Sequence, residues 1–217
     1  MRPPSAPDRD RPHRRPPSLD RNSILRKQPG VKIAFIGSHG VGKTTLCFDL
    51  ASRLKRLDLG VDIVKEVARN CPLPINEGTT LEAQAWILHT QIAEELASST
   101  RNDAVICDRS VLDNYAYLVH RVGRKPEYDA LVAAWVPTYT SLFKVPVLQP
   151  PSFDGTRAVS RDFQLEIDKG IDTLIEAFQV PVHRLDASDR PGWVEAVLQA
   201  AGLPSEPPQI DLFSLQA

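Results

Sequence analysis

A glycine-rich segment near the start of the chain has the residue types and spacing that bind phosphate. Residues 37–44 read Gly-Ser-His-Gly-Val-Gly-Lys-Thr and match the phosphate-loop (P-loop) pattern Gly-x-x-x-x-Gly-Lys-Ser/Thr at every position. Glycines let successive backbone N–H groups curve around phosphate oxygens, and a following helix N-terminus adds partial positive charge. We expect Lys43 to reach the β- and γ-phosphates of a nucleoside triphosphate and Thr44 to bind Mg²⁺. The predicted nucleotide-binding residues are Gly37, Ser38, His39, Gly40, Val41, Gly42, Lys43, Thr44 and Thr45.

One position of this loop is predicted to be chemically silent. His39 occupies a variable position of the pattern, so we expect its side chain to face solvent and to be inert.

Two charged segments beyond the loop supply candidates for the metal and for a second substrate. Asp108 ends the apolar run DAVICD and is followed by Arg109, so Asp108 is a candidate to hold Mg²⁺ with Thr44, directly or through water. The alternative is that Asp108 only caps the next helix. Glu66 lies in the segment Lys-Glu-Val-Ala-Arg (65–69), where a carboxylate can accept a proton from a substrate hydroxyl. A surface glutamate at a strand end is the other interpretation.

The elements that must position these residues alternate between strands and helices. Short apolar runs predict strands, and apolar residues at helical spacing predict helices. The expected strands are 31–37, 61–68, 103–108, 143–149 and 181–186. The expected helices are 43 to about 57, 81–97, 111–122, 127–141, about 161 to 178, and 191–201, with Pro137 kinking or ending the fourth.

Two of these helices carry apolar stripes that we expect to be buried. The first stripe is Leu46, Leu50, Leu54 and Leu57. The second, on the helix over 81–97, is Leu81, Ala85, Leu88, Ile92 and Leu96. Thr79 and Glu82 form a capping-box pattern at the start of that second helix.

Composition separates a basic N-terminal segment from an acidic body. Residues 1–29 hold eight Arg or Lys against three Asp and contain seven of the 19 prolines, which leaves 18 basic and 24 acidic residues in the remainder. We expect residues 1–29 to be a disordered tail, 30–203 to form the folded domain, and 204–217 to be a loose C-terminal tail. A basic arm for an anionic partner and an organelle transit peptide are the alternatives for the first segment.

The same composition argues against several classes of partner. No apolar run approaches the roughly 20 residues that span a bilayer. An acidic body lacks the basic track that a polyanion requires. Cys47, Cys71 and Cys107 are without metal-binding spacing and fit thiols in a reducing compartment. We therefore expect a cytoplasmic protein that contacts neither membrane nor, as its main partner, nucleic acid.

Two short motifs resemble those of small-molecule kinases. Asp108-Arg109-Ser110 resembles the Asp-Arg or Glu-Arg-Ser signature of thymidylate kinases and deoxynucleoside kinases, in which the arginine contacts the phosphate acceptor. Glu66 to Arg69 is similar to the Glu-x-Ala-Arg of ribosylnicotinamide kinase domains. The chain has neither the Asn-Lys-x-Asp of GTP-specific switch proteins nor the Asp-Glu pair of motor ATPases.

A wider resemblance covers about residues 31–200. Residues 78–84 and the later segment Phe153-Asp154-Gly155-Thr156-Arg157, continuing to Arg161, resemble a bacterial family of AAA-type ATP-binding proteins related to the kinase half of the bacterial NAD regulator. The resemblance places Arg157 and Arg161 on a lid over the triphosphate, where mobile arginines stabilise the transferred phosphoryl group. Ordinary solvated surface is the alternative for both.

The resemblance also suggests residues that contact the acceptor. Gln84 and Gln91 share one helix face, and a glutamine on this helix reads the base in related nucleoside kinases. The polar flank of an amphipathic helix is the alternative for both. Arg69, Glu66 and Arg109 complete the predicted acceptor-binding set. Three aromatic residues are candidates to stack on a flat acceptor, with core packing as the alternative: Trp86, Tyr115 and Tyr117.

These observations together predict a fold and a reaction. The fold is a three-layer α/β/α P-loop domain of nucleotide-kinase type, with a doubly wound, five-stranded parallel sheet in the order 2-3-1-4-5. The reaction is transfer of phosphate from ATP with Mg²⁺ to a nucleoside- or nucleotide-like acceptor, and a homodimer is an expected assembly. An ATP-binding regulatory switch with slow hydrolysis is the alternative, and a nucleic-acid end kinase is a third. The predicted catalytic residues are Lys43, Glu66, Asp108, Arg109, Arg157 and Arg161.

Overall fold

A five-stranded parallel sheet forms the centre of the protein. The computed structural model describes residues 30–150 and 160–206. The strands lie in the order β2-β3-β1-β4-β5, and every neighbouring pair is parallel. This confirms the predicted doubly wound sheet and its order. The strand bounds are β1 Val31–Ile36, β2 Val61–Val64, β3 Ala104–Asp108, β4 Ser141–Lys144 and β5 His183–Arg184.

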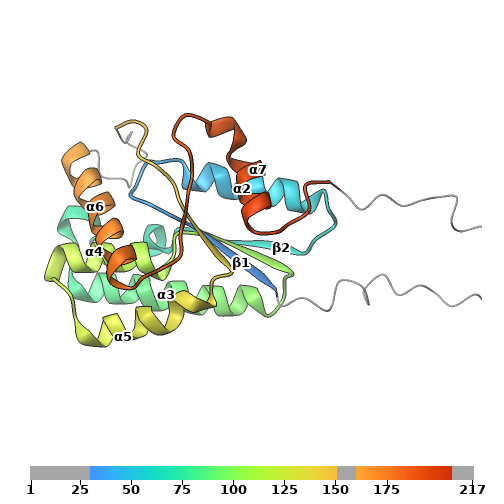
Figure 1. Ribbon diagram of the computed structural model, residues 1–217. Helices are drawn as coiled ribbons and strands as arrows, with labels where there is room; N and C mark the ends of the chain where they lie inside the picture. Colours follow the sequence, from blue (N-terminus) through green and yellow to red (C-terminus); the bar gives the residue numbers. More distant parts are fainter. Residues whose placement is uncertain (1–29, 151–159, 207–217) are drawn as a thin grey trace, which may run out of the picture.

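Helices cover both faces of the sheet and complete three layers. Figure 1 shows α2 and α7 on one face and α3, α4, α5 and α6 on the other. Their bounds are α2 Lys43–Lys55, α3 Leu81–Ser99, α4 Val111–Val122, α5 Pro126–Trp135, α6 Arg161–Ala177 and α7 Trp193–Ala200. Short 3₁₀ turns occupy Val67–Asn70, Asn76–Gly78, Val136–Thr138 and Arg190–Gly192. Among the residues described here, no helix is both long and apolar enough to cross a bilayer.

Each face of the sheet has its own apolar core, because side chains alternate between the faces along a strand. On the α2 side, Ile33 and Phe35 of β1 pack with the predicted leucine stripe, and all four of its leucines are buried. On the other side, Ala34 and Ile36 pack with Leu112 of α4. The sheet therefore fixes α2 and α4 relative to each other through one shared strand.

Several predicted element bounds were wrong, and the backbone explains why. β2 ends at Val64 instead of residue 68, because a 3₁₀ turn begins at Val67. The helix predicted over 127–141 ends at Trp135, and Pro137 lies in the 3₁₀ turn that follows, which confirms that the helix ends at this proline. β4 begins at Ser141 and ends before Pro146, which has no N–H to donate. β5 was predicted over 181–186 and comprises two residues.

The predicted buried face of α3 was right at Leu88, which is buried in the core, but wrong toward the end of the helix. Leu96 is 54% exposed, whereas Gln84, Gln91 and Glu95 are buried with Ile87. Apolar spacing misplaced the face because polar residues occupy part of the buried one. The start of the helix differs as well: Thr80, not Thr79, is the N-cap, and its hydroxyl accepts a hydrogen bond from the Ala83 N–H.

A buried ion pair accounts for this polar face. Lys32 Nζ of β1 lies 2.9 Å from Glu95 Oε2, and its ammonium also lies 4.7 Å from the Trp135 ring centre. The Glu95 carboxylate accepts further hydrogen bonds from the Tyr139 hydroxyl at 2.6 Å, from Trp135 Nε1 at 2.8 Å and from Gln91 Nε2 at 2.9 Å. A buried charge is tolerated when it is paired and hydrogen-bonded in this way.

Removing the carboxylate should destabilise the fold strongly. Glu95→Gln would leave Lys32 charged and buried without its counter-ion, so the free energy of unfolding should fall by about 3–5 kcal/mol. Urea unfolding monitored by tryptophan fluorescence measures this change. Glu195→Gln is the matched control, because Glu195 pairs with Arg53 in solvent and such pairs contribute about 1 kcal/mol or less. Equal small losses in the two variants would contradict a structural role for the buried pair.

Candidate nucleotide-binding and acceptor site

The P-loop joins β1 to α2, as the sequence predicted. Gly37, Gly40 and Gly42 have φ angles of 148°, 78° and 96°, values that residues with a Cβ rarely adopt. A Cβ at Gly37 would also lie 2.9 Å from the Val145 carbonyl oxygen. Gly42 caps α2 without a side-chain hydrogen bond, and the first turn of the helix has no acidic residue. The loop and helix start therefore present backbone N–H groups suited to an anion.

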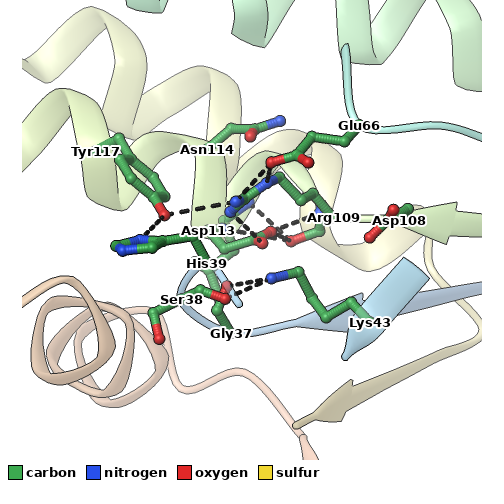
Figure 2. Close-up of polar contacts among 12 residues, drawn as sticks. Gly37, Ser38, His39, Lys43, Glu66, Asp108, Arg109, Asp113, Asn114 and Tyr117 are labelled. Atoms are coloured by element: carbon green, nitrogen blue, oxygen red, sulfur yellow. Dashed lines mark hydrogen bonds and ion pairs between the residues drawn. The ribbon is translucent and has the colours of Figure 1, made fainter. Parts of the chain in front are cut away.

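Lys43 is buried at the centre of this loop. Its ammonium donates hydrogen bonds to the carbonyl oxygens of Gly37 at 2.8 Å and Ser38 at 2.6 Å (Figure 2). Burial, together with the positive charge of Arg109, lowers the pKa of Lys43 to about 8. The ammonium is thus held against the loop and poorly solvated, which favours its transfer to a phosphate oxygen.

Thr44 and Asp108 meet beside the loop. The Thr44 hydroxyl donates to Asp108 Oδ2 at 2.5 Å. Strand register explains the approach, because Phe35 of β1 pairs with Asp108 of β3 immediately before the P-loop begins. A hydroxyl and a carboxylate suit Mg²⁺, which usually binds one or two protein oxygens together with water and substrate phosphates. No group of three or more His, Cys, Asp or Glu suited to a metal occurs among the described residues.

The cap of α4 is Ser110 and not Asp108. The Ser110 hydroxyl accepts from the N–H groups of Leu112 and Asp113, and Asp113 Oδ1 accepts from the Ser110 N–H. The interpretation of Asp108 as only a helix cap was therefore wrong. The Ser-x-x-Asp spacing of this capping box was visible in the sequence, and Asp113 is a site residue that the sequence reasoning missed.

Arg109 lies beside the loop in a strained backbone conformation. Its φ is 105°, and its guanidinium is buried. The guanidinium contacts Glu66 Oε1 at 2.7 Å and Asp113 Oδ2 at 3.4 Å, and it lies 5.0 Å from the Tyr117 ring centre (Figure 2). Strand register also explains why Glu66 and Arg109 are in contact. Val64 of β2 pairs with Cys107 of β3, and Glu66 and Arg109 each follow two residues later.

Glu66 carries a full negative charge in this arrangement. Burial favours a higher pKa for its carboxyl, but the positive charges of Arg109 and Lys43 outweigh burial and lower the pKa to about 2. The second carboxylate oxygen lies 2.9 Å from Arg69 Nε. A carboxylate held by two arginines at such a pKa is a weak proton acceptor, so this geometry favours hydrogen-bond acceptance and orientation over general-base catalysis.

Two adjoining cavities lie at this site, and three residues line both of them. The cavity over the P-loop has a volume of about 160 Å³, and the neighbouring recess, between α3 and α4, about 40 Å³. Both are lined by His39, Glu66 and Arg109. The recess is further lined by Ala68, Arg69, Ile75, Asn76, Gln84, Ile87, Asn114 and Tyr117. The phosphate site therefore opens directly onto a second, polar site.

The predicted acceptor residues separate into those that line the recess and those that do not. Gln84 lines it, and its Nε2 donates to Thr79 Oγ1 at 2.8 Å. Gln91 lies behind it and donates to the Arg109 carbonyl oxygen at 3.2 Å. Tyr117 lines the recess. Tyr115 is buried in the core, with its hydroxyl 2.6 Å from Asp129.

Of the two predicted lid arginines, only Arg161 lies within the described residues. Arg161 is exposed as the first residue of α6 and lines neither cavity. Arg157, with the rest of its Asp-Gly-x-Arg segment, lies outside the described residues. Their roles at the triphosphate stay predictions.

The expectation for His39 was wrong. Its side chain is buried, with Nδ1 3.1 Å from the Tyr117 hydroxyl oxygen and the ring centre 5.5 Å from that of Phe163 in α6. His39 occupies a variable position of the P-loop pattern, but α4 and α6, which lie outside the pattern, bury its side chain.

Comparisons with known proteins agree with this geometry. A family model described as an AAA domain matches residues 32–190. No curated protein matches the sequence. Among solved structures, that of NadR protein in complex with NR aligns with a TM-score of 0.67 and 16% identity over 88% of this chain and 56% of that one. The chain thus spans little more than half the length of NadR.

Two kinases align over nearly their whole length. Thymidylate kinase from Ehrlichia chaffeensis gives a TM-score of 0.57 and 20% identity, over 79% of this chain and 100% of that one. Deoxyadenosine kinase from M. mycoides, with the products dCMP and a flexible dCDP bound, gives 0.55 and 15%, over 79% and 99%. At these identities the likeness concerns the fold, which is that of P-loop kinases. Because the family model covers most of the chain, the protein belongs to this family of AAA domains, with a P-loop nucleotide-kinase-like fold.

Proposed function

We propose that the protein binds ATP with Mg²⁺ and transfers the γ-phosphoryl group to a hydroxyl of a nucleoside- or nucleotide-like small molecule. The observation that carries the proposal is the junction of the two cavities, which share His39, Glu66 and Arg109. A phosphate donor in the P-loop cavity would lie beside an acceptor in the recess. Proximity of this kind supplies much of the rate enhancement in phosphoryl transfer.

Residues of the P-loop cavity would hold the donor. Lys43 would exchange its two backbone acceptors for oxygens of the β- and γ-phosphates, as charge spreads over the transferred group. Thr44 and Asp108 would hold Mg²⁺, which neutralises phosphate charge when bound.

The recess residues would orient the acceptor. In the proposed step the acceptor oxygen forms a bond to the γ-phosphorus, the bond between that phosphorus and the β–γ bridging oxygen breaks, and the hydroxyl proton leaves to solvent or to a phosphate oxygen. Glu66 would accept a hydrogen bond from the hydroxyl, and Arg109 would fix the position of Glu66. A loose transition state for phosphoryl transfer needs little help from a strong base, which agrees with the low pKa of Glu66.

One observation favours the alternative of an ATP-binding regulatory switch. The recess volume of about 40 Å³ is well below the roughly 300 Å³ or more of typical small-molecule sites, so a nucleoside can enter only if α3 and α4 or their loops separate. ATP consumption measured with a panel of nucleosides, nucleotides and vitamin ribosides distinguishes the two functions. Stimulation by a panel member supports a kinase; slow turnover that no member changes supports the switch.

Binding of the donor should weaken as pH rises through the pKa of Lys43. Below about 8 the ammonium is charged and attracts phosphate, and above it the neutral amine contributes little. Calorimetric titration with Mg·AMP-PNP, a non-hydrolysable ATP analogue, between about pH 6.5 and pH 9.5 should show falling affinity and proton uptake near the upper end. Lys43→Arg, which stays charged, should lose this dependence. The same slope in both proteins would exclude Lys43 as its source.

Substitution of Asp108 should affect magnesium more than nucleotide. Asp108→Asn keeps the shape of the side chain but removes its charge, so the Mg²⁺ midpoint for AMP-PNP binding should rise by about 10-fold or more, while affinity in EDTA changes little. Asp49→Asn, an exposed position on α2, is the control. Coincident Mg²⁺ titrations for the wild-type protein and Asp108→Asn would contradict the assignment.

Substitution of Glu66 should separate acceptor use from donor binding. With an acceptor found by the panel, Glu66→Gln should lower kcat/KM for that acceptor by about 10²-fold, while AMP-PNP affinity stays near normal. The exposed Glu82 supplies the control Glu82→Gln. Because Glu66 is ionised throughout the range from about pH 5 to pH 9, the wild-type rate profile should have no acidic limb from this group. Normal turnover by the Glu66→Gln variant would show that Glu66 does not act on the acceptor.

A further inference from the structure

His39 connects three parts of the molecule that no sequence motif links. It belongs to the P-loop and lines both cavities. Its Nδ1 lies 3.1 Å from the Tyr117 hydroxyl oxygen on α4, and its backbone carbonyl oxygen accepts a hydrogen bond from Gln164 Nε2 on α6 at 2.8 Å. Its ring also packs against Phe163, whose centre lies 5.5 Å away. The residue is therefore held from two helices while its backbone forms part of the phosphate loop.

The Tyr117 hydroxyl continues this contact to Arg109. Arg109 Nη2 lies 3.5 Å from the same hydroxyl oxygen, and the guanidinium lies over the tyrosine ring (Figure 2). An arginine can donate but not accept, so the tyrosine oxygen accepts from Arg109, and the same hydroxyl shares a hydrogen bond with His39 Nδ1 in a direction set by the tautomer of the imidazole. The three side chains thus form a continuous chain of contacts between the recess and the phosphate loop.

Phosphate binding would act next to His39, at the P-loop end of these three side chains. In the structure Lys43 Nζ is bonded to the carbonyl oxygens of Gly37 and Ser38. An ammonium that moves to a phosphate releases the Ser38 carbonyl, whose peptide bond is shared with His39. A rotation of that peptide that also changes the His39 backbone would move the His39 ring relative to Tyr117.

We propose that His39 is a positioning residue that transmits occupancy of the P-loop through the Tyr117 hydroxyl to Arg109, and so aligns the acceptor site when the donor is bound. The inference rests on the proposed function, since it requires a phosphate donor in the loop. It adds a role for a position that the P-loop pattern leaves free, and it explains why a histidine there is buried between two helices. The physical basis is a continuous set of side-chain contacts between the two cavities. Each of these contacts can be removed by substitution of a single residue.

The test follows Arg109 directly and needs no acceptor. Arg109 Nε–H is observed by ¹⁵N–¹H NMR, with its signal assigned by its loss in Arg109→Lys. In the wild-type protein, saturating Mg·AMP-PNP should shift this signal. Tyr117→Phe removes the hydroxyl but keeps the ring, and His39→Phe keeps a ring against Phe163 but removes Nδ1. In both variants the shift at saturation should fall to less than half of the wild-type value.

A matched control separates this path from general aromatic packing. His120 also packs on Phe163, at 5.2 Å between ring centres, but its Nε2 faces Glu166 at the surface. His120→Phe should therefore retain the full shift of Arg109. Tyr117→Phe keeps the experiment decisive if His39→Phe fails to fold.

The outcomes distinguish this inference from the proposed function. If Mg·AMP-PNP binds and both variants keep the wild-type Arg109 shift, the nucleotide acts on Arg109 directly and the inference is wrong. If Mg·AMP-PNP binds and Arg109 does not respond in the wild-type protein, the inference is also wrong while donor binding stands. If the wild-type protein binds no Mg·AMP-PNP, the proposed function fails and the inference fails with it.

Discussion

The buried positive charge of Arg109 is the constraint on which the site depends. A guanidinium is always protonated, so its burial is tolerated only where carboxylates and other acceptors surround it. Here these partners come from separate elements: Glu66 follows β2, while Asp113 and Tyr117 lie on α4. Satisfying one charge therefore fixes the turn after β2 and the start of α4 around the end of β3. The positive φ of Arg109 is retained because these contacts outweigh its cost.

The polar face of α3 supports the same residue from behind. Gln91 donates both to the Arg109 carbonyl oxygen and to Glu95, and Glu95 pairs with Lys32 at the start of β1. A continuous hydrogen-bonded network thus runs through the core from one end of the sheet toward the other. Networks of this kind are rigid when fully satisfied, because each lost bond leaves a polar group buried without water. The sheet therefore holds the proposed acceptor side of the site by polar contacts as well as by apolar packing.

Sequence reasoning recovered the fold, and it named several residues that the structure brings together beside the P-loop, because both results depend on local patterns. A complete P-loop between an apolar strand and a leucine-striped helix identifies a strand, a phosphate loop and a helix from neighbouring residues alone. The carboxyl ends of parallel strands must also lie along one edge of the sheet. It could not recover the register between β2 and β3, which brings Glu66 to Arg109. It also misjudged α3 and His39. In both cases a polar side chain is buried by partners distant in sequence, Lys32 for Glu95 and Tyr117 for His39, and periodicity records polarity but not partners.

The two arginines of the recess, Arg109 and Arg69, differ in how tightly they are held, and this difference bears on how an acceptor would enter. Arg109 is buried and held by Glu66, Asp113 and Tyr117, whereas the side chain of Arg69 is 40% exposed beside Glu66. The recess therefore has an inner wall held by buried ion pairs and an outer wall that belongs to the 3₁₀ turn after β2. A recess of about 40 Å³ can enlarge most readily on the outer side, because movement there exposes few buried charges. An acceptor would then be bound between a buried arginine, held by its ion pairs, and a turn that adjusts to it.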